Sequence, residues 1–200
     1  MESVYTSYQG NNNLLIEKVA ALYLHEGDRI ADVTYGKGVF WRNIDTSKYQ
    51  FFPSDIMTCP TASFDFRNLP YGDNDFDAAV LDPPYVHNPG SMIINDNYKN
   101  KETTKGFYHK DIIQLYREGM VEARRVLTVG GLLLVKCKDE IESSKQYMSH
   151  IEIHDIAVKE LGFSVQDLFV LTQKCSPIVQ HKVQKHARKN HSYLWVFKRM

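Results

Sequence analysis

The sequence has few cysteines, no long apolar run and no excess of charge of either sign. Its three cysteines, Cys59, Cys137 and Cys175, lie far apart, are odd in number and form no Cys-x-x-Cys pair. This pattern argues against a disulfide framework and against a zinc site, and it is typical of a reducing compartment such as the cytoplasm. The eight histidines show no metal-ligand spacing, and no serine lies in a nucleophile-elbow sequence. We therefore expect neither a metal centre nor a hydrolase triad.

Two further absences narrow the class of protein. No stretch approaches the roughly 18 apolar residues of a membrane span, and the N-terminus lacks the basic and apolar regions of a signal peptide. Lysines and arginines number 24 and so do the acidic residues, which leaves a formal net charge of zero. Because the field of the whole molecule does not attract polyanions, any contact with nucleic acid must come from a local basic patch.

The hydrophobic pattern predicts one α/β domain over residues 1–200. Apolar runs predict strands at 29–33, 49–52, 63–66, 76–81, 132–136, 163–172 and 193–197, and helical spacing predicts helices at 13–26, 39–45, 110–127 and 149–161. Alternating strands and helices indicate a doubly wound, mostly parallel sheet of seven strands with helices on both faces. In such sheets ligands bind beyond the carboxyl ends of the strands, where the strand order reverses.

The tetrapeptide Asp82-Pro83-Pro84-Tyr85 follows directly on a buried strand. The prolines lack an N–H and have a fixed φ, so they end the ladder and hold the preceding carbonyls outward. The Asp82 carboxylate and such a carbonyl are two acceptors that match the two hydrogens of an exocyclic amine. Tyr85 offers a flat face on which a base can stack, which contributes about 1 to 3 kcal/mol. The alternative is an ordinary proline turn with Asp82 as a cap and Tyr85 in the core.

A glycine-containing segment, Asp32-Val33-Thr34-Tyr35-Gly36-Lys37-Gly38, lies between a predicted strand and a predicted helix. Glycines at such a junction allow a tight turn and a close approach of backbone to ligand. The segment matches neither the dinucleotide fingerprint nor a Walker A loop, so phosphate binding is disfavoured. Asp55 lies 23 residues after Asp32, close to the spacing at which a second-strand carboxylate binds ribose hydroxyls, and we favour this role over a solvated loop aspartate.

Taken in order, these motifs resemble the S-adenosylmethionine-dependent amino-methyltransferases of nucleic acids. Residues 122–131 and 190–197 also resemble the helix-to-strand junction and the last strand of that family. The resemblance implies a Rossmann-like methyltransferase fold and S-adenosylmethionine as the cofactor. It assigns the methionine end to the glycine segment, the ribose to Asp55, and the adenine to an acidic residue at the end of the third strand with an aromatic neighbour. The implied cofactor-binding residues are Asp32, Thr34, Tyr35, Gly36, Gly38, Asp55, Asp65 and Phe66, and the implied catalytic residues are Asp82, Pro83, Pro84 and Tyr85.

The chain departs from this family in two respects. Thr34 stands where many members have phenylalanine, so an aromatic contact to the cofactor is either missing or supplied by Tyr35. The core fold also takes up nearly the whole chain, which leaves no room for a separate target-recognition domain. Recognition must then rest on loops, on a protein partner or homodimer, or be relaxed. The loop at 86–107 is one candidate, against the alternative of a surface connection.

A second candidate is a basic segment that has no acidic residue over positions 174–191 and is suited to phosphates. The residues predicted to bind nucleic acid there are Lys174, Lys182, Lys185, Arg188 and Lys189, and the alternative is a solvated basic loop. The favoured activity is methylation of adenine N6 in DNA, because the Asp-Pro-Pro-Tyr variant resembles adenine enzymes more than cytosine-N4 ones. Cytosine N4 stays open. The alternatives are an RNA amino-methyltransferase and a cofactor-binding subunit that positions nucleic acid for a partner.

Overall fold

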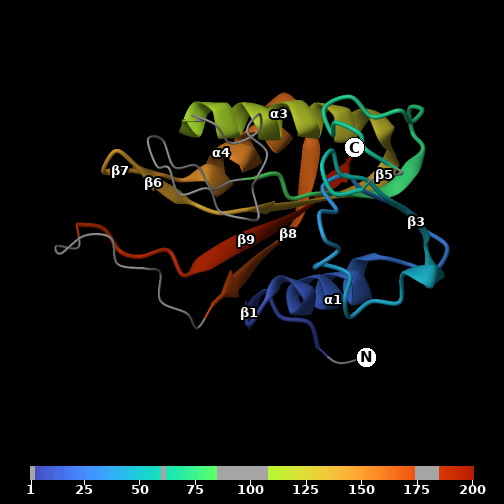
Figure 1. The fold of residues 1–200 in the computed structure, drawn as a ribbon, viewed down its shortest axis with the longest axis horizontal. Helices are drawn as coiled ribbons and strands as arrows, with labels where there is room; N and C mark the ends of the chain where they lie inside the picture. The colour runs from blue at the N-terminus through green and yellow to red at the C-terminus, as the bar shows by residue number, and fades with distance from the viewer. Residues whose placement is uncertain (1–2, 60–61, 85–107, 174–184) are drawn as a thin grey trace.

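A seven-stranded sheet forms the centre of the molecule, with helices on both of its faces (Figure 1). The structure, a computed structural model, describes residues 3–59, 62–84, 108–173 and 185–200. The strands are β1 Ser7–Gln9, β2 Arg29–Asp32, β3 Gln50–Pro53, β4 Phe76–Leu81, β5 Leu127–Cys137, β8 Phe163–Thr172 and β9 His191–Arg199. The helices are α1 Asn12–Tyr23, α3 His109–Val126 and α4 Ser149–Asp155, which continues as a π-helical turn Ile156–Glu160. None of the helices in the described ranges combines the length and the apolarity that a bilayer span requires.

The strand order is β1-β8-β9-β5-β4-β2-β3. Strands β3, β2, β4 and β5 are mutually parallel, and β9 is antiparallel to both β5 and β8. Strand β8 therefore runs in the same direction as β4, and the carboxyl ends of β2, β4, β5 and β8 share one edge of the sheet. The chain leaves β2 outward to β3 and then returns to β4 on the other side of β2. This reversal is the position at which open α/β sheets bind their ligands.

Each face of the sheet packs on its own hydrophobic cluster. In β4, Ala79 and Leu81 face the cluster of α3 and α4, whereas Ala78 and Val80 face the cluster of α1. Figure 1 shows α3 and α4 on one side of the sheet and α1 on the other. Because β4 is covered on both faces, its sequence is almost continuously apolar, and its predicted bounds at 76–81 are confirmed.

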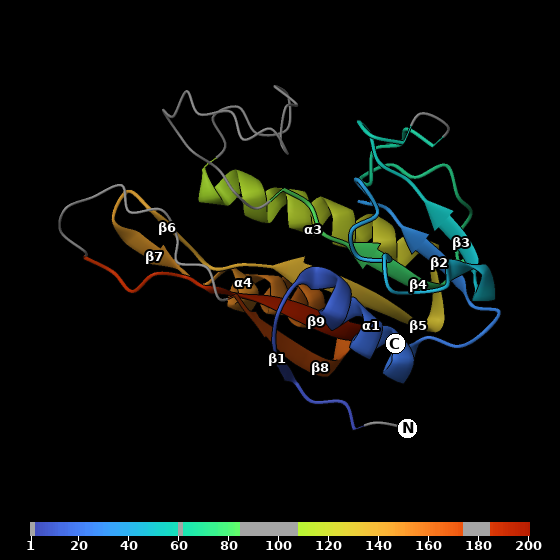
Figure 2. The same ribbon diagram turned by 60° about the horizontal axis from the view of Figure 1, so that its bottom comes forward.

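A short hairpin extends from the carboxyl edge of the sheet. It consists of β6 Glu140–Glu142 and β7 Lys145–Tyr147, directly after β5, and it projects away from the sheet in Figure 2. The sequence analysis did not predict this hairpin or the edge strand β1.

Two predicted elements are absent from the described residues. Residues 39–45 form successive turns rather than a helix: the backbone N–H groups of Trp41 and Ile44 donate to carbonyls three residues back, and the Trp41 indole bonds to Asp32. Residues 63–66 form no strand, and the chain turns at 66–68 where Arg67 pairs with Asp65. The sheet thus has the predicted number of strands. The predicted strand at 63–66 is missing from it, and β1, at the edge opposite to β3, is the additional strand.

Candidate methyl-transfer site

The glycine turn and the Asp-Pro-Pro segment meet at the carboxyl ends of β2 and β4. Asp82, Pro83 and Pro84 follow β4 directly, and the backbone N–H of Asp82 donates to Thr34 Oγ1 at 2.7 Å. The two motifs, almost 50 positions apart in the chain, are therefore joined side by side. Thr34 accepts this hydrogen bond through its hydroxyl, a group that the phenylalanine found at this position in many members of the resembled family lacks. Tyr85 lies outside the described residues.

Asp32 is a buried carboxylate at the end of β2, with only 2% of its surface exposed. Its Oδ2 accepts from the indole N–H of Trp41 at 2.6 Å, and its Oδ1 accepts from the backbone N–H of Thr34 at 3.1 Å. Burial raises the pKa of Asp32 to about 7, although both hydrogen bonds act in the opposite direction. The carboxylate thus orders the start of the glycine turn from below. Sequence reasoning missed Trp41, whose role depends on this contact.

The turn after Asp32 needs its glycines. Gly36 has φ +55° and Gly38 has φ +66°, in the left-handed region that side chains disfavour. A Cβ atom at Gly38 would also collide with the ring of Tyr35, which in turn packs edge-on against Phe51 with centroids 5.9 Å apart. The sequence-predicted residues Thr34, Tyr35, Gly36 and Gly38 are therefore brought together in one turn, in which Gly38 is buried against the Tyr35 ring.

Asp55 connects the loop after β3 to this turn. Its Oδ1 accepts from the backbone N–H groups of Met57 and Thr58 at 2.9 and 2.7 Å, and its Oδ2 accepts from the N–H of Gly36 at 3.2 Å. The Thr58 hydroxyl donates to the Gly36 carbonyl at 2.6 Å, which strengthens the same connection. A carboxylate accepts about four hydrogen bonds, so Asp55 retains capacity for a further donor. Its ribose-binding role stays a prediction.

Asp82 is a partly exposed residue that has one buried carboxylate oxygen. The residue as a whole is partly exposed, whereas its Oδ1 atom is buried and has no hydrogen-bond partner within the described part of the chain. Burial raises the pKa of Asp82 to about 6, and the nearby charge of Lys136 opposes this rise. At neutral pH the carboxylate is thus mostly ionised and has an acceptor oxygen available. Sequence reasoning missed Lys136, because the lysine was assigned only as the last residue of an apolar strand.

Asp65 and Phe66 both contact other parts of the protein than the glycine turn. Asp65 does not end a strand but forms an ion pair with Arg67, with 2.6 Å between Oδ2 and Nη2, and this pairing lowers the pKa of Asp65. The Phe66 ring packs against α3 at Gly119, where a Cβ atom would come within 2.8 Å of the ring. The structure therefore gives both side chains local partners, and their adenine-binding role stays a prediction.

The described part of the basic segment, residues 185–190, is named the basic connection here because it leads into β9. Lys185 and Arg188 are exposed and Lys189 is partly exposed, while His186 Nε2 lies 2.8 Å from the carbonyl oxygen of Ser144 in the β6–β7 turn. It leads into His191, which pairs with Thr172 at the carboxyl end of β8, and so reaches the same sheet edge as Asp82. The predicted residues Lys174 and Lys182 lie outside the described residues, as do Tyr85 and the loop at 86–107.

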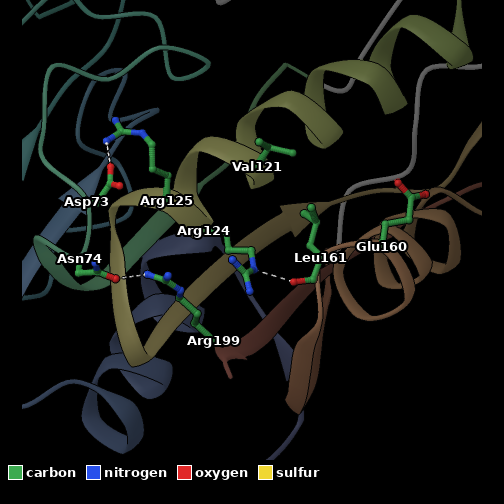
Figure 3. Close-up of a pocket in the computed structure, with 8 residues that line it drawn as sticks. All are labelled: Asp73, Asn74, Val121, Arg124, Arg125, Glu160, Leu161 and Arg199. Carbon is green, nitrogen blue, oxygen red and sulfur yellow. Dashed lines mark hydrogen bonds and ion pairs between the residues drawn. The ribbon is translucent and has the colours of Figure 1, made fainter.

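A pocket of about 460 Å³ lies at the opposite, amino-terminal edge of the sheet (Figure 3). Its arginines bind neighbouring groups of the protein: Arg125 pairs with Asp73 at 2.7 Å, and Arg124 donates to the Leu161 carbonyl at 2.7 Å. Arg199, at the end of β9, donates to Asn74 at 2.5 Å. These bonds fasten α3 and β9 to the loop before β4. The pocket is thus built from structural contacts and is distant from the glycine turn.

Comparison with solved structures identifies the fold. The chain resembles a SAM-dependent methyltransferase of Methanosarcina mazei with a TM-score of 0.56 at 11% identity, over 91% of this chain and 97% of that one. It resembles a SAM-dependent methyltransferase of Aquifex aeolicus with a TM-score of 0.52 at 12% identity, over 92% and 89%. It also resembles the [4+2]-cyclase SpnF with a TM-score of 0.57 at 14% identity, over 98% and 88%. The predicted doubly wound, Rossmann-like methyltransferase fold is therefore confirmed.

Comparisons based on sequence found no relative of the chain. The chain matches no protein-family model, and a search of curated proteins also gave no match. The resemblance is thus one of fold, and the chemistry has to be inferred from the residues of the site.

Proposed function

We propose that the protein transfers a methyl group from S-adenosylmethionine to an exocyclic amine of a nucleic-acid base, with adenine N6 in DNA as the favoured target. One observation carries the proposal: the Asp82 carboxylate has a buried oxygen without a hydrogen-bond partner among the described residues, directly beside the glycine turn. A buried acceptor that lacks a donor is costly, and the N–H of a bound amine satisfies it.

The residues at the edge of the sheet fit the cofactor. Two structures of this fold are described as SAM-dependent methyltransferases, but the cyclase of the same fold indicates that fold alone does not determine the reaction. The fit therefore rests on the chain itself. Gly36 and Gly38 adopt the positive φ values that form the turn, and Asp32 and Asp55 bond to its backbone, so acidic groups that suit a cationic ligand lie beside it. When bound, the cofactor supplies an electrophilic methyl group on a positively charged sulfur.

The chain contributes geometry and charge to the reaction. Asp82 and the carbonyls that precede Pro83 and Pro84 accept the amine hydrogens, which directs the nitrogen lone pair toward the methyl group. Bound there, S-adenosylmethionine would supply the methyl group and leave as S-adenosylhomocysteine, and the proton released from the nitrogen would pass to water. Because a conjugated amine is a weak nucleophile, positioning and electrostatic complementarity account for most of the acceleration. A target within a duplex must be flipped out, at a cost of a few kcal/mol.

Long segments at the same edge are available for target recognition. The basic connection leads into β9 beside the carboxyl end of β8, and the β6–β7 hairpin that it contacts follows β5. We assign phosphate contacts to this surface, and a protein partner or a homodimer is the alternative source of recognition. An amine of RNA and cytosine N4 are the alternative targets.

The test is to identify the methylated product. The protein is incubated with S-adenosylmethionine carrying an isotope-labelled methyl group and, separately, with DNA, transfer RNA and ribosomal RNA, and the nucleosides are analysed by mass spectrometry. We expect labelled N6-methyladenine from DNA with the wild type and its loss with Asp82→Asn. The nearby carboxylate variant Asp77→Asn, at the amino-terminal half of β4, serves as the matched control. Label at a carbon or a hydroxyl, or full activity in Asp82→Asn, would contradict the proposal.

A further inference from the structure

Lys136 is a buried lysine in the central sheet. It lies in β5 between Val135 and Cys137, and only 1% of its surface is exposed. Taking an ammonium group out of water costs several kcal/mol unless an opposite charge or hydrogen bonds compensate for the lost hydration. A strand position of this kind would ordinarily hold valine or leucine. The lysine therefore calls for a partner that makes use of its charge.

The strand register brings Lys136 to Asp82. Leu81 of β4 pairs with Val135 of β5, so the next residue in each parallel strand, Asp82 and Lys136, continues side by side. Side chains alternate along a strand, which places Asp82 on the same face as Val80 and Lys136 on the same face as Leu134. Val80 and Leu134 both belong to the cluster beneath α1. The two charged residues thus share one face at the carboxyl edge.

Asp32 extends this arrangement across a third strand. It pairs with Val80 in the register of β2 and β4 and also faces the α1 cluster through Trp41. Neighbouring strands lie about 4.8 Å apart, so the charges follow one another as Asp32, Asp82 and Lys136. Asp82 therefore lies between the charge of Lys136, which lowers its pKa, and Asp32, whose own pKa the Asp82 charge raises.

The pKa shifts of Asp82 and Lys136 agree with the placement of these two residues side by side. Burial is the main cause that raises the pKa of Asp82, and Lys136 counteracts it. Burial lowers the pKa of Lys136, and Asp82 counteracts that effect in turn. Other titratable groups also act on these residues. Asp55 raises the pKa of Asp32. Cys137 and Lys138 act on Lys136, and Asp139 in turn acts on Cys137.

We propose that Lys136 is a positioning residue that keeps the Asp82 carboxylate ionised and its unpartnered oxygen available to the target amine. The catalytic part of this inference rests on the proposed function, whereas the coupling between the two charges does not. Loss of the ammonium leaves the burial of Asp82 without compensation, so the carboxyl group takes up a proton at neutral pH. A protonated carboxyl has lost part of its acceptor capacity.

The coupling is tested by measuring the titration of Asp82 itself. The protein is labelled with ¹³C at the aspartate carboxyl carbons, and the Asp82 signal is assigned by its absence in Asp82→Asn. In Lys136→Met we expect the pKa of Asp82 to rise by about one to three pH units, the size of the effect of a close opposite charge. Lys136→Arg should stay near the wild type, and the exposed-lysine variant Lys198→Met should match it. An unchanged pKa in Lys136→Met overturns the inference.

A reciprocal measurement decides the matter if Lys136→Met does not fold. Coupling between two sites is mutual, so Asp82→Asn should lower the pKa of Lys136 by a similar amount, read from the ¹³Cε signal of that lysine. Equal Lys136 pKa values in the wild type and in Asp82→Asn overturn the inference.

The catalytic consequence has a separate readout. In the methylation assay, the acidic limb of the pH profile of kcat/KM should move upward in Lys136→Met by the change in the pKa of Asp82, about tenfold in rate per pH unit on that limb. Lys136→Arg should restore the wild-type limb. A limb that does not move in an active Lys136→Met enzyme overturns the positioning role. If the wild type methylates nothing, the proposed function fails, while the two titrations still decide the coupling.

Discussion

The hydrogen bond from Trp41 to Asp32 should stabilise the folded protein more at high pH than at low pH. The substitution Trp41→Phe should reveal this difference. The indole N–H donates to Asp32 Oδ2 at 2.6 Å, and both side chains are buried. Trp41→Phe removes the donor and retains an aromatic ring against Phe51, whose centroid lies 4.6 Å from that of Trp41. The substitution therefore removes one hydrogen bond and part of one ring.

The free energy of unfolding that Trp41→Phe costs depends on the charge of Asp32. The folded-state pKa of about 7 lies above the ordinary aspartate value of 3.8. The stability that Asp32 contributes by binding a proton is therefore present below about pH 4 and is lost as the pH rises through 7. At pH 8 the lost bond is one to a carboxylate, about 1.5 to 3 kcal/mol, and at pH 5.5 it is one to a neutral carboxyl group, about 0.5 to 1.5 kcal/mol. The lost ring atoms add a similar cost at both pH values. We expect Trp41→Phe to cost about 1 to 1.5 kcal/mol more at pH 8 than at pH 5.5.

Urea denaturation of the variant and the wild type at the two pH values measures this difference. Trp195→Phe is a matched control, because the indole of Trp195 donates to the backbone carbonyl of His150 at 3.1 Å, a group that does not titrate. The control should have the same cost at both pH values. A cost of Trp41→Phe that does not change with pH would refute the account of Asp32 as a buried carboxylate that the indole stabilises.

Three further predictions concern the site. Gly38→Ala should destabilise the protein more than Gly27→Ala in thermal denaturation, because both have positive φ but only the alanine at 38 meets a side chain; equal losses would contradict this. Thr34→Val should cost about 1 to 3 kcal/mol of unfolding free energy, since it leaves the buried backbone N–H of Asp82 without its acceptor, and Thr34→Ser should restore most of it. Replacing the basic side chains of the basic connection by glutamine should weaken DNA binding and reduce its salt dependence, whereas Lys198→Gln, at the opposite sheet edge, should leave the salt slope unchanged.

The sequence predicted those parts of the fold that local patterns determine. Strand β4 was predicted with its observed bounds because it is apolar throughout and ends at two prolines. The helix at 39–45 was wrong because Trp41 forms a tertiary bond to Asp32 that no local pattern reveals. The strand at 63–66 was wrong because its alternation of phenylalanine with polar residues comes from packing against α3 and from the Asp65–Arg67 pair.

The same distinction holds for the site. Asp32, the glycine turn and Asp82 were predicted at the carboxyl ends of neighbouring strands, and the structure brings them together. Lys136 could not be placed in the site from the sequence, because its position beside Asp82 depends on the register between β4 and β5, whose paired residues Leu81 and Val135 lie more than 50 positions apart along the chain. A charged residue that ends the most apolar predicted strand was the one signal of its role.

The central claim is that the carboxyl edge between β2 and β4 binds the cofactor and presents Asp82 to the target amine. It is tested most directly by following the backbone amide signals of ¹⁵N-labelled protein during a titration with S-adenosylhomocysteine. The account predicts saturable shifts at Gly36, Gly38 and Asp82, with none at Arg124 or Arg199 of the opposite pocket. Shifts confined to that pocket, or no saturable shift at the glycine turn, would contradict it.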